Sequence, residues 1–245
     1  MLHDHPLIVG ALNALRPAML REEDLKKIAR LKPGERLPWS LSHGEYFTYQ
    51  VFQALLGVID SFDQLERALF YLGSKGKSQT KKPPRYTDWT WLEYHVAYFV
   101  IIYSAIFDRA LILTNEVFQL GNPPKNCKPE IIKSNTSISK EVLDALEGIE
   151  RCSLKLREER NVLLHRGHSI DIAKMLNSEL LDKLKLFYSV KGLSSDYAGP
   201  PFLAIAMKME RRNVKATFEK YAKDAESATR TLLDALKPIY ERKKG

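Results

Sequence analysis

Residues 96–107 read Val-Ala-Tyr-Phe-Val-Ile-Ile-Tyr-Ser-Ala-Ile-Phe, the longest apolar run in the chain. A helix of this length rises about 18 Å, which is too short to cross the roughly 30 Å hydrocarbon core of a bilayer. The run lies within residues 89–120, where apolar side chains occupy more than one helical face, as is typical of a central bundle helix. Thr87 or Asp88 can cap this helix, and Gly121-Asn122-Pro123-Pro124 ends it abruptly. The sequence therefore predicts a buried helix that other helices surround.

Helical periodicity recurs on both sides of this segment, and the alternation typical of strands is scarce. Residues 202–210 fit either a strand or the start of the last helix, and Pro238 follows that helix. The pattern predicts an all-α fold, a bundle of four to five helices with short extra helices. The predicted helices are residues 21–31, 44–72, 89–120, 140–166, 177–190 and 211–236.

Length and composition favour one compact domain with additions over two full domains. The chain has 245 residues, of which 44% are hydrophobic, enough for a sizeable core. We expect an N-terminal extension with a short helix at 1–43 and the helical bundle domain at 44–240. Within that domain, residues 168–210 form an insertion-like segment before the last long helix.

Charge and cysteine usage narrow the functional classes. The chain has 38 Lys and Arg against 30 Asp and Glu, and the net charge of +8 suits a polyanionic partner. Cys127 and Cys152 do not form a C-x-x-C pair, which excludes a zinc ribbon or a thioredoxin-like site and favours free thiols. The N-terminus has no basic-then-apolar signal pattern, so we expect a cytoplasmic protein that does not enter a membrane.

The most informative stretch for chemistry is residues 160–167, Arg-Asn-Val-Leu-Leu-His-Arg-Gly, at the end of the predicted helix 140–166. Arg160 can neutralise a phosphate with its planar guanidinium, and His165 can move a proton near neutral pH. Asn161 precedes His165 by four residues on the same helical face and can orient the imidazole or the phosphate. Cleavage of RNA through its own 2′-hydroxyl needs a base, an acid and cations around the phosphate. These residues therefore suit a ribonuclease that uses no metal.

Two observations limit this interpretation. About one Arg–His pair with four to six intervening residues is expected by chance in such a chain, and Arg36 with His43 is a second match. That pair straddles Pro38 and is not expected to be helical. The structural alternative for the first pair is a solvated Arg160 beside Glu residues and a His165 that the helix dipole favours. Positions five apart also lie about 140° around a helix, so Arg160 and His165 meet only if the helix end unwinds or a second subunit closes the site.

Residues 160–167 resemble the signature of HEPN domains, in which an Arg, often followed by a polar residue, precedes a His by four to six positions. Residues 105–121 also resemble the preceding helix of some prokaryotic HEPN families, and the likeness in helix order covers about residues 44–236. The resemblance implies an all-helical homodimer whose two motifs meet across a cleft. Many members are metal-independent endoribonucleases of toxin–antitoxin, abortive-infection or CRISPR-linked defence systems, and others have no known catalysis.

The resemblance assigns the catalytic roles to Arg160, Asn161 and His165, which match the motif position by position. We expect a HEPN-type endoribonuclease that cuts single-stranded RNA, with no cofactor, in a defence or toxin–antitoxin setting. Its expected partners are RNA, a second copy of the chain, and an antitoxin or other protein. The alternative is a non-catalytic HEPN-like module that binds a protein, a nucleotide or RNA.

The basic stretch at 75–85 is the second candidate contact with RNA, since the aromatic residues that follow it can stack on a base. The alternative for this stretch is a solvated linker. The expected RNA-binding residues are Lys75, Lys77, Lys81, Lys82, Arg85 and Arg166.

Other polar residues receive structural interpretations. No metal site is expected, because the pairs His165–His168 and His3–His5 lack an acid or a Cys to complete a ligand set. His95 lies in the apolar central helix and is expected to be a hydrogen-bonded interior side chain. Asp108-Arg109 in the same helix is expected to form a buried or interface hydrogen-bonding pair, with facing the cleft as the alternative.

Overall fold

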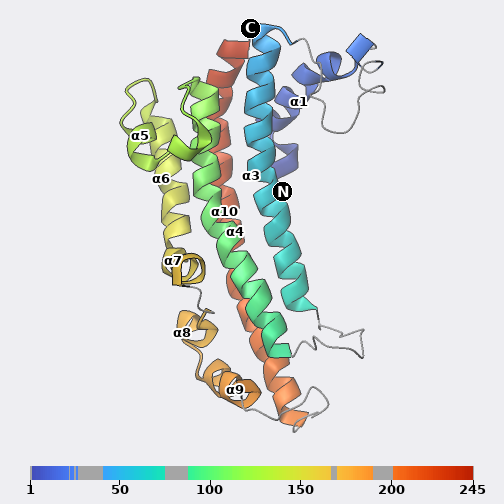
Figure 1. Ribbon diagram of the computed structural model, residues 1–245, viewed down its shortest axis with the longest axis vertical. Helices are drawn as coiled ribbons and strands as arrows, with labels where there is room; N and C mark the ends of the chain where they lie inside the picture. The colour runs from blue at the N-terminus through green and yellow to red at the C-terminus, as the bar shows by residue number, and fades with distance from the viewer. Residues whose placement is uncertain are drawn as a thin grey trace. The chain divides into compact units, whose positions relative to one another are not determined.

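The computed structural model describes residues 2–21, 23, 24, 26, 41–74, 88–166, 170–189 and 201–244. Every regular element in these ranges is a helix, as Figure 1 shows, so the all-α prediction is confirmed. Two 3-10 turns, Leu2–Asp4 and Pro124–Asn126, accompany the α-helices. The α-helices are α1 (Pro6–Met19), α3 (His43–Gly73), α4 (Asp88–Phe118), α5 (Pro129–Lys133), α6 (Lys140–Leu154), α7 (Arg157–Arg166), α8 (Ile172–Leu176), α9 (Glu179–Ser189) and α10 (Pro201–Lys244).

Hydrogen bonds at the helix ends explain where α3 and α4 begin and end. The Ser42 backbone N–H donates to Glu45 Oε2 at 2.8 Å and the Glu45 N–H donates to Ser42 Oγ at 3.3 Å, a capping box that starts α3. At the end of α4, Gln119 takes a positive φ of 56° and the Leu120 N–H bonds the Asn115 carbonyl at 3.0 Å. This Schellman-type ending stops α4 two residues before the predicted Leu120.

The prediction of one continuous helix at 140–166 is wrong in one respect. This segment forms two helices, α6 and α7. The N–H groups of Lys155 and Leu156 bond the carbonyls three residues earlier, at Cys152 and Ser153, in a tight 3-10 turn. Neither proline nor glycine occurs at the break. The turn coincides instead with tertiary contacts, since Leu156 is only 2% exposed and Lys155 bonds Asp224 at 2.9 Å.

Two further helix predictions need correction, and the alternatives left open for residues 202–210 are decided in favour of a helix. The sequence analysis missed α1, although Leu7, Ala11 and Leu15 are buried at helical spacing. Residues 202–210 are helical, and α10 continues beyond the predicted end at 236, through Pro238. A proline removes only its own N–H group from the hydrogen bonds of a helix. Tyr240, two residues after Pro238, is fully buried and stacks on Phe47 with ring centroids 5.9 Å apart, and this contact holds the last turns of α10.

Two short segments complete the comparison with the sequence. Of the helix predicted at 21–31, the structure describes only residues 21, 23, 24 and 26. The helix predicted at 177–190 is α9, and the short α8 before it was missed. Asp171 caps α8 by accepting from the Lys174 N–H at 3.3 Å, and Asn177 ends it with a φ of 51°.

The chain forms two compact units, and the first contains Met1–Asp60, Phe107–Glu150 and Glu226–Gly245. In this unit α10 contacts α4 through a hydrogen bond of 2.7 Å from Lys243 Nζ to the Phe118 carbonyl. The segment before α1 is tied to α10 by a 3.0 Å hydrogen bond between His5 Nε2 and Asp234 Oδ1. These bonds, with the Phe47–Tyr240 ring contact, hold α1, α3 and α4 on the C-terminal part of α10.

Arg109 and Asp108 do not form the expected buried pair. Arg109 Nη1 donates to the Gly57 carbonyl of α3, whereas the Asp108 side chain is exposed. The buried alternative is therefore wrong for Asp108, whereas the interface alternative stays a prediction, and Arg109 connects α4 with α3 inside the first unit.

The second unit contains Ser61–Ile106 and Arg151–Ala225. Its core has a stack of fully buried rings, Phe99 of α4 on Phe218 of α10, with centroids 4.1 Å apart and planes 16° apart. The Tyr98 hydroxyl bonds Gln64 Oε1 of α3 at 3.3 Å. Helix α9 follows α8, and Lys185 of α9 pairs with Asp171 at 3.2 Å.

Helix α4 is the apolar element of both units. The whole of α4 is long and apolar enough to cross a membrane, although the twelve-residue run at 96–107 alone is too short to do so. The inner helix of a soluble protein has the same composition, and 56% of the most apolar window of α4 is buried inside the protein. Its burial fits the predicted role of a central helix.

The ring stack predicts a large loss of stability when it is removed. Replacement Phe218→Ala leaves a cavity against Phe99 and is expected to lower the free energy of unfolding by about 3–5 kcal/mol. Urea unfolding followed by circular dichroism measures the loss. The variant Lys220→Ala, at an exposed position of the same helix, should change stability by less than about 0.5 kcal/mol; equal losses in the two variants would contradict this account of the core.

Candidate functional site

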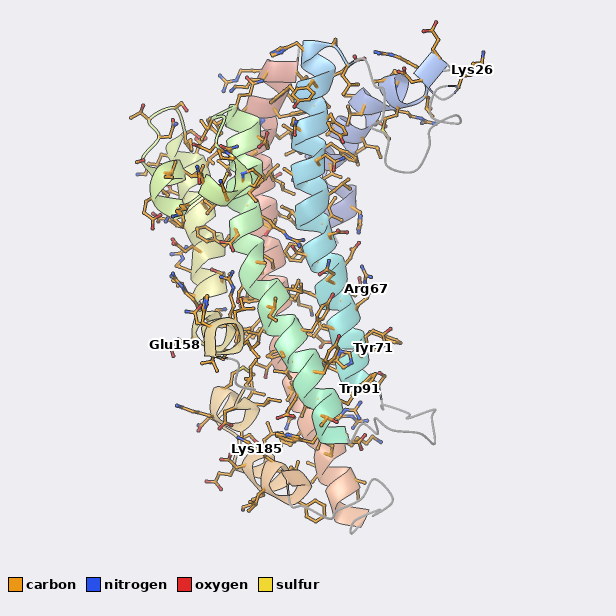
Figure 2. The ribbon with its side chains drawn as sticks, in the orientation of Figure 1. Lys26, Arg67, Tyr71, Trp91, Glu158 and Lys185 are labelled. Atoms are coloured by element: carbon orange, nitrogen blue, oxygen red, sulfur yellow. The ribbon has the colours of Figure 1, made fainter. Side chains whose placement is uncertain are left out.

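Helix α7 carries the Arg–His motif and is anchored to α10 at its start. Leu156, immediately before the helix, is buried, and Lys155 Nζ pairs with Asp224 Oδ2 at 2.9 Å and lies 5.2 Å from the Tyr221 ring centroid. Glu158, labelled in Figure 2, and Glu159 occupy the first turn, where acidic side chains favour the helix dipole. The motif is therefore presented by a short helix whose first turn is fixed and whose last residue is Arg166.

The structure places Asn161 and His165 together on the exposed surface of α7. Both side chains are exposed, and four residues separate them, so they share one helical face. Leu164 beside them is 50% exposed. Arg160 is half-buried, and its backbone N–H bonds the Leu156 carbonyl at 3.1 Å. An accessible imidazole with an amide one turn away is able to meet a large substrate such as RNA.

Arg160 and His165 point in different directions in one chain. Helix α7 is continuous from Arg157 to Arg166, so the two positions keep the roughly 140° separation of an ideal helix. Within this helix the two side chains therefore lie on different faces of α7.

Several predicted residues lie outside the described part of the chain. These are the basic residues Lys75, Lys77, Lys81, Lys82 and Arg85, together with His168 and Arg36. Arg166 is the last residue of α7, and only its backbone is described. His43, the second member of the chance pair, is the exposed first residue of α3.

The structure shows the surroundings of both cysteines and of the side chains that could bind a metal. Cys127 and Cys152 are free thiols, and burial raises the pKa of both, so neither is an activated nucleophile. Within the described ranges, no group of three or more His, Cys, Asp or Glu side chains converges as a metal site would require.

An aromatic cluster around His95 was not predicted. The His95 ring is 6% exposed, lies 4.4 Å from the Trp91 ring and stacks on Tyr71 at 5.1 Å. Figure 2 shows Tyr71 and Trp91 close together, and Trp91 Nε1 bonds the Tyr71 carbonyl at 3.1 Å. Neither His95 ring nitrogen has a hydrogen-bond partner among the described residues, so the expectation of a hydrogen-bonded interior histidine is wrong. Burial, and then the charge of Arg211, lower the pKa of His95, which favours the neutral ring.

The part of the chain that the structure describes is helical, and it carries the Arg-Asn-x3-His motif on the surface helix α7, as the HEPN resemblance leads us to expect. A family model described as HEPN_Cthe2314-like HEPN matches residues 54–239 of the 245-residue chain. The chain therefore belongs to this HEPN family, and the resemblance read from the sequence is confirmed. No curated protein and no solved structure is significantly similar to it.

The environment of His95 predicts a pH-dependent stability. Because the folded state lowers the pKa of His95, the unfolded chain binds a proton first, and stability is lost as pH falls below the ordinary value of 6.5. We expect the urea midpoint to fall between pH 7.5 and 5.5, and to fall less in His95→Phe, which keeps the ring packing. The exposed His43→Phe variant should keep the wild-type slope; an unchanged slope in His95→Phe would show that another group causes the loss.

Proposed function

We propose that this protein is a metal-independent endoribonuclease of HEPN type that cleaves single-stranded RNA through the 2′-hydroxyl. The observation that carries the proposal is the Arg160–Asn161–His165 motif in a HEPN-family chain, on a helix that leaves the imidazole and the amide accessible. We further propose a cytoplasmic protein of a defence or toxin–antitoxin system, in which an antitoxin or other protein restrains the nuclease.

The chemistry follows from the three side chains. His165 removes the proton of the 2′-hydroxyl or donates one to the leaving 5′-oxygen. Arg160 holds the non-bridging oxygens as negative charge develops on the phosphorane. Asn161, on the same face as His165, orients the imidazole or the phosphate. One chain offers one such histidine, although the reaction needs both a base and an acid.

A homodimer would supply the second histidine that the reaction needs. It would also bring an arginine and a histidine together although they lie on different faces of one helix. Two copies of α7 that face each other across a twofold axis bring two imidazoles and two guanidiniums around one phosphate. The half-exposed Leu164 beside His165 supports this arrangement, because it supplies apolar surface next to the motif. Arg166 and the basic stretch 75–85 would then bind the RNA on either side of the cleavage point.

The nuclease proposal predicts RNA cleavage in EDTA that depends on the motif. We expect His165→Ala and Arg160→Ala to lower the cleavage rate of a mixed single-stranded RNA by roughly a hundred- to ten-thousand-fold. Gel analysis of end-labelled RNA measures the rate, and a 2′-deoxy substitution at the cleaved position should abolish it.

The control for this experiment is His43→Ala, an exposed histidine of the chance pair. Its cleavage rate should equal that of the unmodified protein. Cleavage that survives in His165→Ala, or that EDTA removes, would contradict the proposal. RNA binding without cleavage would favour the alternative, a non-catalytic HEPN-like binding module.

The dimer proposal predicts that activity and assembly are lost together. Replacement Leu164→Glu places two carboxylates at the proposed twofold contact and is expected to give a monomer that does not cleave RNA. Light scattering after size-exclusion chromatography measures the mass. The matched control is Leu186→Glu on α9, where the side chain is 71% exposed, and it should leave mass and activity unchanged. A fully active monomer of the unmodified protein would refute the dimer.

A further inference from the structure

Helix α10 carries an exposed strip of two apolar and two cationic residues near its start, within the second unit. Ile205 and Met209 are 61% and 54% exposed, and Lys208 and Arg212 are exposed as well. Their spacing is i, i+3, i+4 and i+7, so all four residues lie on one face of the helix. We call these four residues the α10 strip.

The α10 strip is divided into two parallel rows, because residues four apart form a ridge along a helix. One row is apolar, Ile205 and Met209, and the other is cationic, Lys208 and Arg212. Single exposed apolar residues are common on proteins, whereas neighbouring ones that polar residues border are typical of contact surfaces. Met and Arg are also enriched at such surfaces. The strip therefore has the composition of a docking surface.

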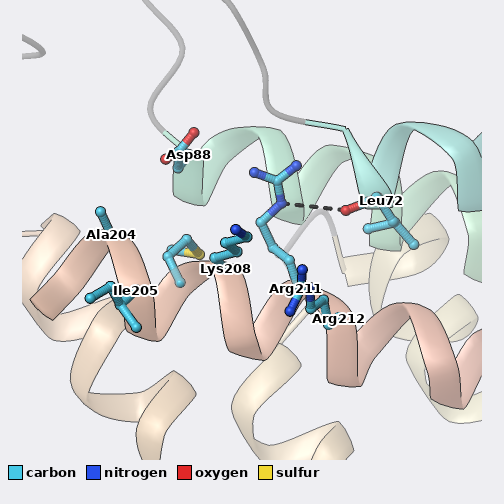
Figure 3. Close-up of a pocket in the computed structure, with 9 residues that line it drawn as sticks. Leu72, Asp88, Ala204, Ile205, Lys208, Arg211 and Arg212 are labelled. Carbon is cyan, nitrogen blue, oxygen red and sulfur yellow. Dashed lines mark hydrogen bonds between the residues drawn. The ribbon is translucent and has the colours of Figure 1, made fainter.

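A pocket of about 430 Å³ adjoins the strip. Figure 3 shows it bordered by α10, the end of α3 and the start of α4, and Ile205, Lys208 and Arg212 of the strip are part of its lining. Leu72 and Met207 add apolar lining. Anchor side chains of a bound partner commonly fill such pockets. The pocket is large enough to take one aromatic or long aliphatic side chain beside the strip.

Arg211 lines the same pocket but has a structural role. It is only 7% exposed, and its Nε donates to the Leu72 carbonyl at 3.3 Å, which joins α10 to the end of α3. Burial lowers the pKa of Arg211, and the charge of Asp88, a half-buried carboxylate of the lining, raises it. Arg211 and Asp88 therefore act on each other within the wall of the pocket, and Lys208 and Arg212 are the exposed cations of the described lining.

The cations of the strip are open to carboxylates of a partner. Among the residues that the structure describes, neither Lys208 nor Arg212 has an ion-pair partner, whereas Lys215 of the same helix pairs with Glu219 at 3.5 Å. Two such cations in one row attract a partner with negative charge and repel a basic one. Complementarity of charge therefore favours an acidic partner.

The apolar row distinguishes an acidic protein from RNA. Phosphates of RNA would neutralise the cationic row, but bases stack on aromatic rings, and the aliphatic side chains of Ile205 and Met209 offer none. An amphipathic helix covers both rows at once, because its own ridges repeat every four residues, as those of α10 do. The strip therefore fits a protein helix with apolar and acidic rows side by side.

We propose that the α10 strip and the adjoining pocket bind an acidic amphipathic helix of a partner protein. Apolar side chains four apart on that helix pack along Ile205 and Met209, and one of them enters the pocket. Its Asp or Glu side chains pair with Lys208 and Arg212. No residue of α7 lines the pocket in the described part of the chain, so the inference goes beyond the proposed nuclease and does not depend on it.

Selection from a displayed library of random peptides of about 18 residues, which is five helical turns, tests the proposal on the full-length protein. We expect enriched sequences with large apolar residues four apart and with Asp or Glu at the adjoining positions. Fluorescence anisotropy of the most enriched peptide, labelled with a dye, then measures its affinity. Titration into His165→Ala should give the same affinity, which separates the strip from the motif.

Substitutions of the exposed apolar row locate the bound peptide without disturbing the core. Ile205→Ser and Met209→Ser should each weaken the peptide roughly tenfold or more, because each removes an apolar contact that the peptide covers. The matched control is Leu12→Ser on α1 in the first unit, where the side chain is 45% exposed. This variant should bind the peptide as the unmodified protein does.

Exchange of charges tests the cationic row. Lys208→Glu and Arg212→Glu should each weaken the peptide roughly three- to tenfold at low salt. A peptide with Lys in place of its acidic residues should regain binding to the variant that carries both substitutions. Lys220→Glu, at an exposed position of the same helix outside the pocket, is the matched control and should leave the affinity unchanged.

Four results would overturn the proposal. Absence of enrichment, or enrichment of basic or uncharged peptides, would show that no acidic helix is recognised. Equal binding by Ile205→Ser would place the peptide elsewhere on the protein. Equal weakening by Lys220→Glu would show diffuse attraction to the basic helix. A short single-stranded RNA that displaces the peptide, and that loses affinity in Lys208→Glu but not in Ile205→Ser, would assign the surface to nucleic acid.

Discussion

The burial of α4 is the constraint on which the rest of the structure depends. A helix that is apolar on several faces must be covered by other helices, and α3 and α10 supply that cover within each unit. In the second unit the contact is the Phe99–Phe218 stack, and in the first it is the bond from Lys243 to the end of α4. Other positions of α10, Tyr221 and Asp224, contact Lys155 at the start of the motif helix.

Helix α10 positions the motif by holding the start of α7. At the motif, α10 contributes Asp224 and Tyr221, which fix Lys155 and thereby the start of α7, while Asn161 and His165 stay exposed. Elsewhere on α10, Arg211 is 7% exposed, its Nε donates to the Leu72 carbonyl at 3.3 Å, and its Nη2 has no hydrogen-bond partner among the described residues. An exposed imidazole suits a large substrate that brings its own partner groups.

The break between α6 and α7 has a functional consequence. If residues 140–166 formed one helix, the direction of the motif would follow from α6 alone. The turn at Lys155 and Leu156 lets α7 take a direction set by its contacts with α10, and so determines what the exposed face of His165 can meet. A homodimer of the proposed kind needs that face on the surface, and Leu164 extends it with apolar area.

Local sequence determined the helical class, the extents of α3, α4 and α9 to within a few residues, and the motif of a HEPN protein, because periodicity, caps and residue spacing are properties of neighbouring residues. The signal for α1 was also present in Leu7, Ala11 and Leu15. The tertiary structure alone decided the break before α7, the continuation of α10 through Pro238, the exposure of Asp108, and the burial of His95 and Arg211, whose ring nitrogens and Nη2 respectively have no partner among the described residues. These features depend on partners that are far away in the chain, such as Asp224 for Lys155, Phe47 for Tyr240 and Leu72 for Arg211, and no local pattern encodes such contacts.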